Sequence, residues 1–207
     1  MKKRLRKNIE LGVLFGLICA VIMSFARFQA RCDELRGGVL RLHILANSDE
    51  EYDQRLKLKV RDGILETTGQ YLKNVDNIDD AMAVIGSNIT KITAAADRVI
   101  KEEGYDYKVT AAIEKNFFEN REYDDFTLPA GVYNSLTVRI GKSGGHNWWC
   151  VVFPGICLPS AQKSGLEKAV SAESAESADI AKNASKYRLR LKTVEIFEKI
   201  KNKILKK

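Results

Sequence analysis

The spacing of apolar residues changes several times along the chain, and each change predicts a different element. Between residues 39 and 45, leucine and isoleucine alternate with Arg41 and His43, a period of two that is typical of a half-buried strand. From Tyr52 to Ile64 the apolar residues recur at every fourth position, which is the period of an amphipathic helix. The chain is therefore expected to pass from a strand into a helix near residue 48.

Capping residues mark the starts of two helices. Ser48, with Glu51 three residues later, has the spacing of a capping box. Asp76 or Asn77 precedes the second predicted helix, which Gly104 ends. The apolar stripe of this second helix proceeds in steps of three and four residues and consists of Met82, Ile85, Ile89, Ile92, Ala96 and Val99.

The second half of the chain predicts three further strands. Residues 105–113 and 132–140 alternate with a period of two, whereas residues 116–125 are polar with aromatics and are expected to form a loop. The glycine-rich residues 141–145 are expected to form a hairpin loop, from which residues 148–153 pair back as an antiparallel strand. These blocks predict an α+β domain: an antiparallel sheet with helices packed on it, preceded by an N-terminal signal or anchor segment.

The first 26 residues have the pattern of an export segment. Five basic residues precede an uncharged run from residue 11 to Ala26, which as a helix rises about 24 Å, less than the roughly 30 Å of a bilayer core. Small residues at positions 24 and 26 suit a signal peptidase, so cleavage after Ala26 is expected. The alternative is an uncleaved anchor, extended by Ile9 and Phe28. Both outcomes place the rest of the chain outside the cytoplasm, because the positive end stays inside.

The rest of the chain divides into three parts. Residues 38–157 are expected to form the folded domain. Residues 158–185 are rich in Ser, Ala, Glu and Lys without an aromatic residue, which predicts a polar surface linker. Residues 186–207 are expected to form a last helix, with Val194, Phe197 and Ile200 among many charges.

The net charge argues against a nucleic-acid partner. The whole chain has a net charge of +7, with 34 basic and 27 acidic residues. Without the first 26 residues, 29 basic and 26 acidic residues remain, a net of only +3. This mild balance, together with export, does not favour nucleic acid.

The four cysteines predict no metal site. Cys19 lies in the export segment and Cys32 follows the expected cleavage site. Cys150 and Cys157 flank a Pro-Gly turn, and a disulfide between them would contribute roughly 2–3 kcal/mol on the chain-entropy model. Two buried free thiols are the alternative. The spacing lacks the paired ligands of structural zinc, and we expect neither a metal nor a cofactor.

Trp148 and Trp149 are adjacent on a predicted strand, so their rings must point to opposite faces. One ring is expected to pack on the stripe of the second helix. The other ring, with the loop at residues 144–147, is expected to form a binding surface. The alternative is that both rings are buried between layers.

Two parts of the sequence bear on nucleotide binding or catalysis. Gly141-Lys142-Ser143 lacks the earlier glycine of a phosphate-binding loop, because Leu136 stands at that position. A secreted or anchored cell-envelope cysteine hydrolase would use Cys150 as its nucleophile, His146 or His43 as base, and Asn147 or an aspartate to orient that base. However, Cys150 lies in an apolar run that would raise its pKa and reduce its reactivity. We therefore expect no catalytic residues, and the hydrolase is the alternative.

Two sequence blocks resemble the signatures of the stage II sporulation protein R family. The first comprises residues 44–49 (ILANSD), 53–54 (DQ) and 56–62 (LKLKVRD). The second comprises residues 128–133 (LPAGVY), 140–141 (IG) and 147–154 (NWWCVVFP). Pro154-Gly155 stands where a second proline is expected, and residues 50–52 are less typical, but both departures lie in loops.

The resemblance implies a signalling protein of endospore-forming bacteria. Members of the family are made in the forespore and exported into the space between the two cells. There they activate the mother cell's membrane-embedded aspartic protease, which then processes the precursor of sigma-E. A third class, a wall-binding structural module, would show repeats or aromatic platforms spread along several strands, and the sequence has neither. The contact surface that we expect comprises Asn47, Ser48, Asp49, His146, Asn147, Trp148 and Trp149.

Overall fold

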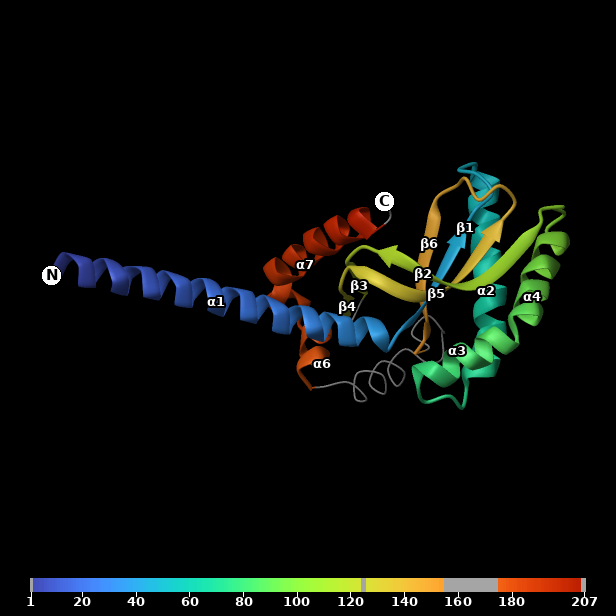
Figure 1. The fold of residues 1–207 in the computed structure, drawn as a ribbon. Coiled ribbons are helices and arrows are strands. Elements are labelled where there is room, and N and C mark those ends of the chain that lie inside the picture. Colours follow the sequence, from blue (N-terminus) through green and yellow to red (C-terminus); the bar gives the residue numbers. More distant parts are fainter. Residues whose placement is uncertain (1, 124–125, 155–174, 206–207) are drawn as a thin grey trace.

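The computed structural model describes residues 2–123, 126–154 and 175–205. A long helix leads into an α+β body, to which two C-terminal helices return (Figure 1). The elements in chain order are α1 (Lys2–Gly37), β1 (Leu40–Leu45), α2 (Glu51–Leu72), α3 (Ile78–Ser87), α4 (Ile89–Glu102), β2 (Val109–Phe118), β3 (Arg121–Tyr123), β4 (Phe126–Leu128), β5 (Gly131–Ile140), β6 (Asn147–Phe153), α6 (Ala175–Lys182) and α7 (Ala184–Leu205).

The main sheet has the strand order β2-β5-β1-β6, and β3 and β4 form a small second sheet. The predicted α+β class with helices on a sheet is confirmed. The sheet is mixed, however, because β1 and β5 run parallel, while β1–β6 and β2–β5 are antiparallel. The predicted hairpin between residues 132–140 and 148–153 is wrong, since β1 lies between β5 and β6.

The central position of β1 follows from the burial of both its faces. Leu42 and Ile44 lie on one face and are fully buried under the helices. Arg41 and His43 on the other face are only 1% and 7% exposed, so the prediction of a half-buried strand is wrong. A strand with two buried faces needs a layer of structure on each side and a pairing partner along each edge.

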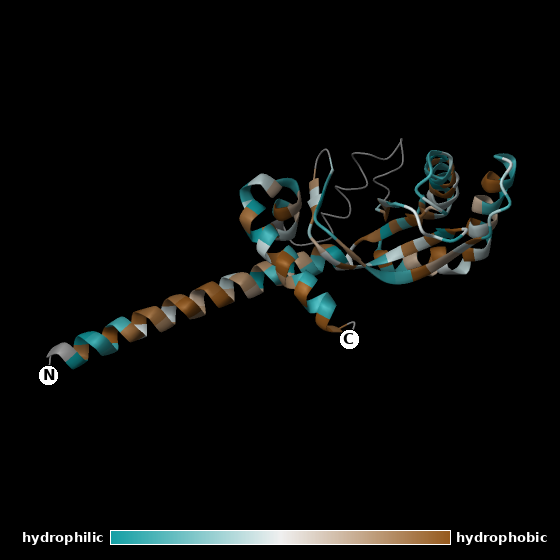
Figure 2. Cartoon of the chain, turned by 90° about the horizontal axis from the view of Figure 1, so that it is seen from above, coloured by the Kyte–Doolittle hydropathy of each residue, from teal (hydrophilic) through white to brown (hydrophobic). Residues whose placement is uncertain are grey.

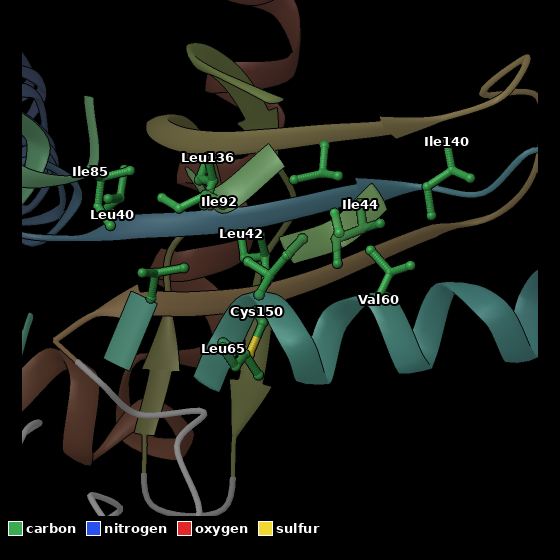
Figure 3. Close-up of a cluster of buried hydrophobic side chains, with 14 of the residues drawn as sticks. Leu40, Leu42, Ile44, Val60, Leu65, Ile85, Ile92, Leu136, Ile140 and Cys150 are labelled. Carbon is green, nitrogen blue, oxygen red and sulfur yellow. The ribbon is translucent and has the colours of Figure 1, made fainter. Parts of the chain in front are cut away.

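Helices α2, α3 and α4 cover one face of the sheet (Figure 1). Figure 3 shows their apolar side chains meeting those of β1, β5 and β6. The fully buried members of this first core include Leu40, Leu42, Ile44, Val60, Ile64, Ile85, Ile92, Ala96, Ile100, Leu136 and Val138. This is the amphipathic packing that the helical stripes predicted.

Elements from both ends of the chain cover the other face. The second core combines Phe28 and Leu35 of α1 with Ile180 of α6 and Val194 of α7. The predicted linker is therefore wrong at its end, because α6 is a helix packed on the body; residues 158–174 of that linker lie outside the described residues. The second core covers the polar face of β1 that the first core leaves uncovered.

Arg41 is the most deeply buried charge of this second core. Its guanidinium lies 4.0 Å from the ring centre of Phe118 and 5.0 Å from that of Tyr133. One Nη donates a hydrogen bond to the Tyr123 hydroxyl at 2.9 Å. Burial lowers the pKa of Arg41, and the aromatic faces offset part of the lost hydration.

Two predicted boundaries also need correction. The single helix expected between residues 77 and 104 is divided at Asn88 into α3 and α4, although Asn77 caps its start as predicted. The loop expected at residues 116–125 is wrong, because β2 continues to Phe118 and is followed by β3. Asp124 and Asp125 lie outside the described residues.

Helix α1 continues through the expected cleavage site without interruption. Its apolar first half projects from the body (Figure 2). The apolar 18-residue stretch that marks this helix as a candidate membrane span is not buried in the body. The Phe25 ring meets the Phe197 ring of α7 edge-on at 5.5 Å, just before Ala26. The apolar segment and the body thus share one helix.

The first core sets the stability of the body, and we expect Leu42→Ala to show it. Leu42 is fully buried on the central strand, so its truncation should cost about 2–5 kcal/mol of unfolding free energy. Leu189→Ala is a matched control, because Leu189 is 85% exposed and its loss should change the free energy by less than about 0.5 kcal/mol. Equal losses in chemical denaturation of the two variants would contradict this assignment of the core.

Candidate functional site

Two loops meet at the end of the sheet where β1 ends, which is the end away from α1. The first comprises residues 46–50, between β1 and α2, and the second comprises residues 141–146, between β5 and β6. We call them the paired loops. They contain the Asn47–Asp49 and His146 positions that the sequence analysis proposed for binding, and Asn147 follows directly as the first residue of β6.

Backbone hydrogen bonds join the paired loops. The N–H of Gly145 donates to the carbonyl of Ala46 at 3.1 Å, and the N–H of Gly144 donates to the carbonyl of Asn47 at 3.1 Å. The side-chain oxygen of Asn47 also accepts from the N–H of Lys142 at 2.9 Å. Segments almost a hundred residues apart in the sequence therefore form one unit.

The close approach of the paired loops requires glycine at two positions. A Cβ at Gly145 would lie 2.1 Å from the carbonyl oxygen of Ser48. A Cβ at Gly141 would lie 2.3 Å from Oδ1 of Asn47, and Gly141 has a φ of +54°. At Gly144 the nearest atom would be 3.5 Å away, an ordinary contact. The glycine-rich stretch thus serves loop packing, with Gly145 as the tightest point.

Asp53 of α2 holds the first loop from below. Its side chain is 1% exposed, and Oδ2 accepts from Asn47 Nδ2 at 2.8 Å and from Ser48 Oγ at 2.6 Å. The predicted capping role of Ser48 is wrong in position, because α2 begins at Glu51 with Glu50 as its N-cap. The Ser48 hydroxyl instead fixes the loop to Asp53.

Lys57, one helical turn after Asp53, reaches the second loop. Its side chain is 4% exposed, and Nζ donates to the carbonyl of His146 at 3.0 Å and to Gln54 Oε1 at 2.5 Å. Gln54 Nε2 donates in turn to the carbonyl of Ser48 at 2.8 Å. Burial lowers the pKa of Lys57, and the nearby Asp49 carboxylate opposes that shift.

The outer rim of the paired loops is exposed. An Asp49 oxygen accepts from the N–H of His146 at 2.5 Å and also contacts the His146 ring. These two hydrogen bonds, the backbone one foremost, lower the pKa of Asp49. The Asp49 and His146 side chains are 57% and 80% exposed, so water screens the pair and it adds little to stability. Both groups are available to a partner.

The two tryptophan rings point to opposite faces, as their adjacent positions predicted. Trp148 pairs with Ile44 and packs against the first core, with the Arg61 guanidinium 4.6 Å from its ring centre. The ring lies in the same core as the α3–α4 stripe on which it was predicted to pack, and the charged group beside it comes from α2. Trp149 packs in the second core, stacked on His43 at 3.8 Å and edge-on to Phe118 at 4.6 Å. Each ring has packing partners within the body, and neither projects freely.

His43 connects the strand to the paired loops. Its Nε2 is 3.1 Å from Oδ1 of Asn147, while its Nδ1 is buried without a hydrogen-bond partner. Burial is the main cause that lowers the pKa of His43, and the Asn147 contact opposes it. The ring is therefore neutral near pH 7.

The catalytic set of the hydrolase alternative is not assembled in the described part of the chain. Cys150 is disulfide-bonded and points into the first core toward Leu65 (Figure 3). His43 lies on the opposite face of the sheet, and the ring of His146 contacts Asp49. Cys157, the expected disulfide partner, lies outside the described residues, so that pairing stays a prediction. Among the described residues, no group of three His, Cys, Asp or Glu could hold a metal ion.

Asp53, Gln54 and Lys57 are the supporting residues that the sequence analysis did not assign to the site. Asp53 and Lys57 occupy the same helical face as the buried Val60 and Ile64. Charged groups are rarely buried without a partner. A carboxylate and an ammonium group at core positions of a helix therefore predict hydrogen-bond or ion-pair partners for both.

Comparison with known proteins identifies relatives of this sequence. The profile of the family described as Stage II sporulation protein R matches residues 36–163. A protein of Bacillus subtilis (strain 168) with the name Stage II sporulation protein R is 35% identical over 119 residues, which cover 58% of this chain and 53% of that relative. The match thus spans about half the length of that relative. No solved structure matches the chain.

The buried His43 ring makes stability depend on pH. The pKa of His43 is lower in the folded chain than in the unfolded chain, so the unfolded chain takes up the proton first as pH falls. The contribution of His43 to folding stability is therefore complete above its ordinary pKa of 6.5 and is lost as pH falls below that value. We expect the unfolding free energy to fall below pH 6.5 by at most roughly 1.4 kcal/mol per pH unit from this group. Denaturation of His43→Phe, which cannot titrate, should show a flatter profile; an unchanged slope would contradict the role of His43.

Proposed function

Because the chain belongs to the stage II sporulation protein R family, we propose that it is an exported signalling protein that activates a membrane-embedded aspartic protease of the mother cell. Activation leads that protease to process the precursor of sigma-E. The chain acts as a ligand and has no catalytic step of its own in this proposal. It works in the space between forespore and mother cell, held there or released by its N-terminal segment.

The observation that carries the proposal is the meeting of both family-like sequence blocks in the paired loops. The ILANSD block supplies the first loop, and the DQ and LKLKVRD blocks supply Asp53, Gln54 and Lys57 beneath it. The IG and NWWCVVFP blocks border the second loop on either side. The same residues that resemble the family thus build one exposed rim on a buried polar support.

The position of the paired loops suits contact with a receptor in an opposite membrane. β1 begins three residues after α1 ends and runs for six residues, about 20 Å, to the first loop. The apolar half of α1 lies beyond the other end of the strand (Figure 1). A segment held in the forespore membrane would therefore leave the paired loops facing away from that membrane.

The rim offers polar and aromatic contacts. Its exposed side chains are Asp49, Tyr52, Lys142, His146 and Asn147. Trp148 and Trp149 support this surface indirectly, because their rings pack β6 against the two cores. Exposed groups on a rigid support lose little conformational freedom on binding, which favours specific recognition.

The direct experiment co-expresses the full chain, the candidate membrane protease and the sigma-E precursor in a non-sporulating host. Cleavage of the precursor should require both the protease and this chain. Cleavage without this chain, or no cleavage with correctly exported and folded chain, would contradict the proposal.

Two neighbouring glycines provide a matched pair of variants. Gly145→Ala places a Cβ 2.1 Å from a Ser48 backbone atom and should separate the paired loops, whereas Gly144→Ala meets only an ordinary contact. Overpacking of this kind costs roughly 1–3 kcal/mol, so Gly145→Ala should lower the rate of precursor cleavage about tenfold or more. Gly144→Ala should retain near-normal cleavage. Equal activity of the two variants, with equal amounts of folded protein, would show that the paired loops are not the working surface.

Cys150→Ser separates a ligand from a hydrolase. The variant loses a disulfide and should be less stable by about 2–4 kcal/mol, but a ligand should still activate the protease in proportion to the folded amount. Thermal melting gives the folded fraction, and precursor cleavage gives the activity. A fully folded Cys150→Ser chain without any activity would instead support the hydrolase.

A further inference from the structure

Helix α7 exposes an apolar stripe that the fold does not use. Leu189, Ile196, Ile200 and Ile204 are 85%, 52%, 54% and 67% exposed, and their spacing of seven, four and four residues places them on one face. The opposite face of α7 packs on the body through Leu191, Val194, Glu195 and Glu198. The stripe therefore faces outward while the helix is held in place from behind.

Basic side chains border this stripe on both sides. Lys192, Lys199 and Lys201 form ion pairs with glutamates of the protein. Arg188, Arg190 and Lys203 have no carboxylate partner among the described residues and supply the charge of the flanks. An apolar stripe with basic flanks is typical of helices that lie in the interface of an anionic bilayer. Scattered single apolar residues on a surface would need no such explanation, but Ile196, Ile200 and Ile204 follow one another on successive turns of α7.

The stripe lies at the depth where the apolar part of α1 ends. The Phe197 ring, beside the stripe, contacts Phe25, the residue before the end of the uncharged run. On the other side of α7, the buried Glu198 bonds to Gln29 and pairs with Arg36 at 3.6 Å. Phe197, which lies nearer the stripe than Glu198 does, therefore contacts an earlier residue of α1. The stripe accordingly faces the projecting apolar half of α1.

A cavity of about 500 Å³ lies between α1 and the C-terminal helices at this same level. Its walls combine Met23 and Phe28 with the guanidinium-bearing Arg27, Arg31 and Arg190. Arg31 pairs with Glu34 at 3.3 Å, but among the described residues Arg27 and Arg190 have no carboxylate partner. Arg190 lies 5.8 Å from the Phe28 ring centre, so its charge is directed over the cavity wall.

We propose that α7 lies in the headgroup region of a bilayer and that this cavity receives the phosphate of an anionic phospholipid. Guanidinium groups bind phosphate oxygens in a bidentate manner, and the Met23 and Phe28 walls suit the glycerol and first acyl carbons. The apolar stripe supplies burial in the interface, and the basic flanks supply attraction to the anionic surface. The body would then sit directly on the membrane, with the paired loops pointing away from it.

This inference goes beyond the proposed function, because it concerns lipid and does not depend on the protease. Native mass spectrometry of the full chain, purified in detergent and titrated with dioleoyl phosphatidylglycerol or dioleoyl phosphatidylcholine, tests the cavity. We expect retention of phosphatidylglycerol over phosphatidylcholine, and Arg27→Ala/Arg190→Ala should weaken retention about 30-fold (roughly 2 kcal/mol).

The matched control is Arg55→Ala/Arg98→Ala, which removes the same charge from exposed positions on α2 and α4. It should retain phosphatidylglycerol as the unaltered chain does. Equal weakening by both double variants, or equal retention of the two lipids, would overturn the proposal. Displacement of the bound lipid by millimolar glycerol phosphate would also overturn it, since the site would then take a soluble phosphate.

Hydrogen exchange of the full chain in lipid nanodiscs tests the stripe. In phosphatidylglycerol discs, the amides of residues 196–204 should exchange roughly tenfold more slowly than in phosphatidylcholine discs, while those of α4 stay unchanged. Equal exchange in the two lipids would overturn the docking of α7. Protection that instead grows with protein concentration in both lipids would assign the stripe to contact with a second copy.

Discussion

The burial of β1 on both faces is the constraint on which the rest of the structure depends. Six residues carry leucine and isoleucine toward one core and Arg41 and His43 toward another. A charged and a polar side chain on this face require a second layer that packs against them, with aromatic rings stacked on both groups. Aromatic rings from β2 and β5 and helices from both chain ends provide that layer, so α1, α6 and α7 are parts of the fold and not appendages.

The same strand positions the proposed contact surface. β1 ends at Leu45, just before the first loop. Its neighbour β5 ends at the second loop and β6 begins after that loop, so three strands bring the paired loops to one edge of the sheet. Asp53 and Lys57 then use opposite charges on one helical face to hold one loop each. A buried polar support of this kind is costly to leave incomplete, which keeps the loops in a single arrangement.

The sequence predicted the elements better than their partners. Alternation located β1 and β5, and helical stripes located α2 and the α3–α4 region, because these periods reflect local packing. Alternation alone did not reveal that Arg41 and His43 are buried, since the residues that cover them, such as Phe118, Tyr133 and Trp149, lie far away in the sequence. For the same reason the hairpin between β5 and β6 was wrong: a six-residue loop permits a hairpin, but the insertion of β1 is a tertiary effect.

The proposed contact residues were predicted from the two adjacent tryptophans and from the polar segment after Asn47, and the structure adds how they are held. Asn47, Ser48, Asp49 and His146 meet in the paired loops, which their sequence separation did not show. Asp53 and Lys57 had no assigned role, although their place on a buried helical face was a readable signal. The central claim is that the rim of these loops contacts the protease. Site-specific photo-crosslinking from position 146, compared with position 98 on α4, tests it most directly in the co-expression system. The account predicts a crosslink to the protease from position 146 and none from position 98, whereas the reverse pattern would contradict it.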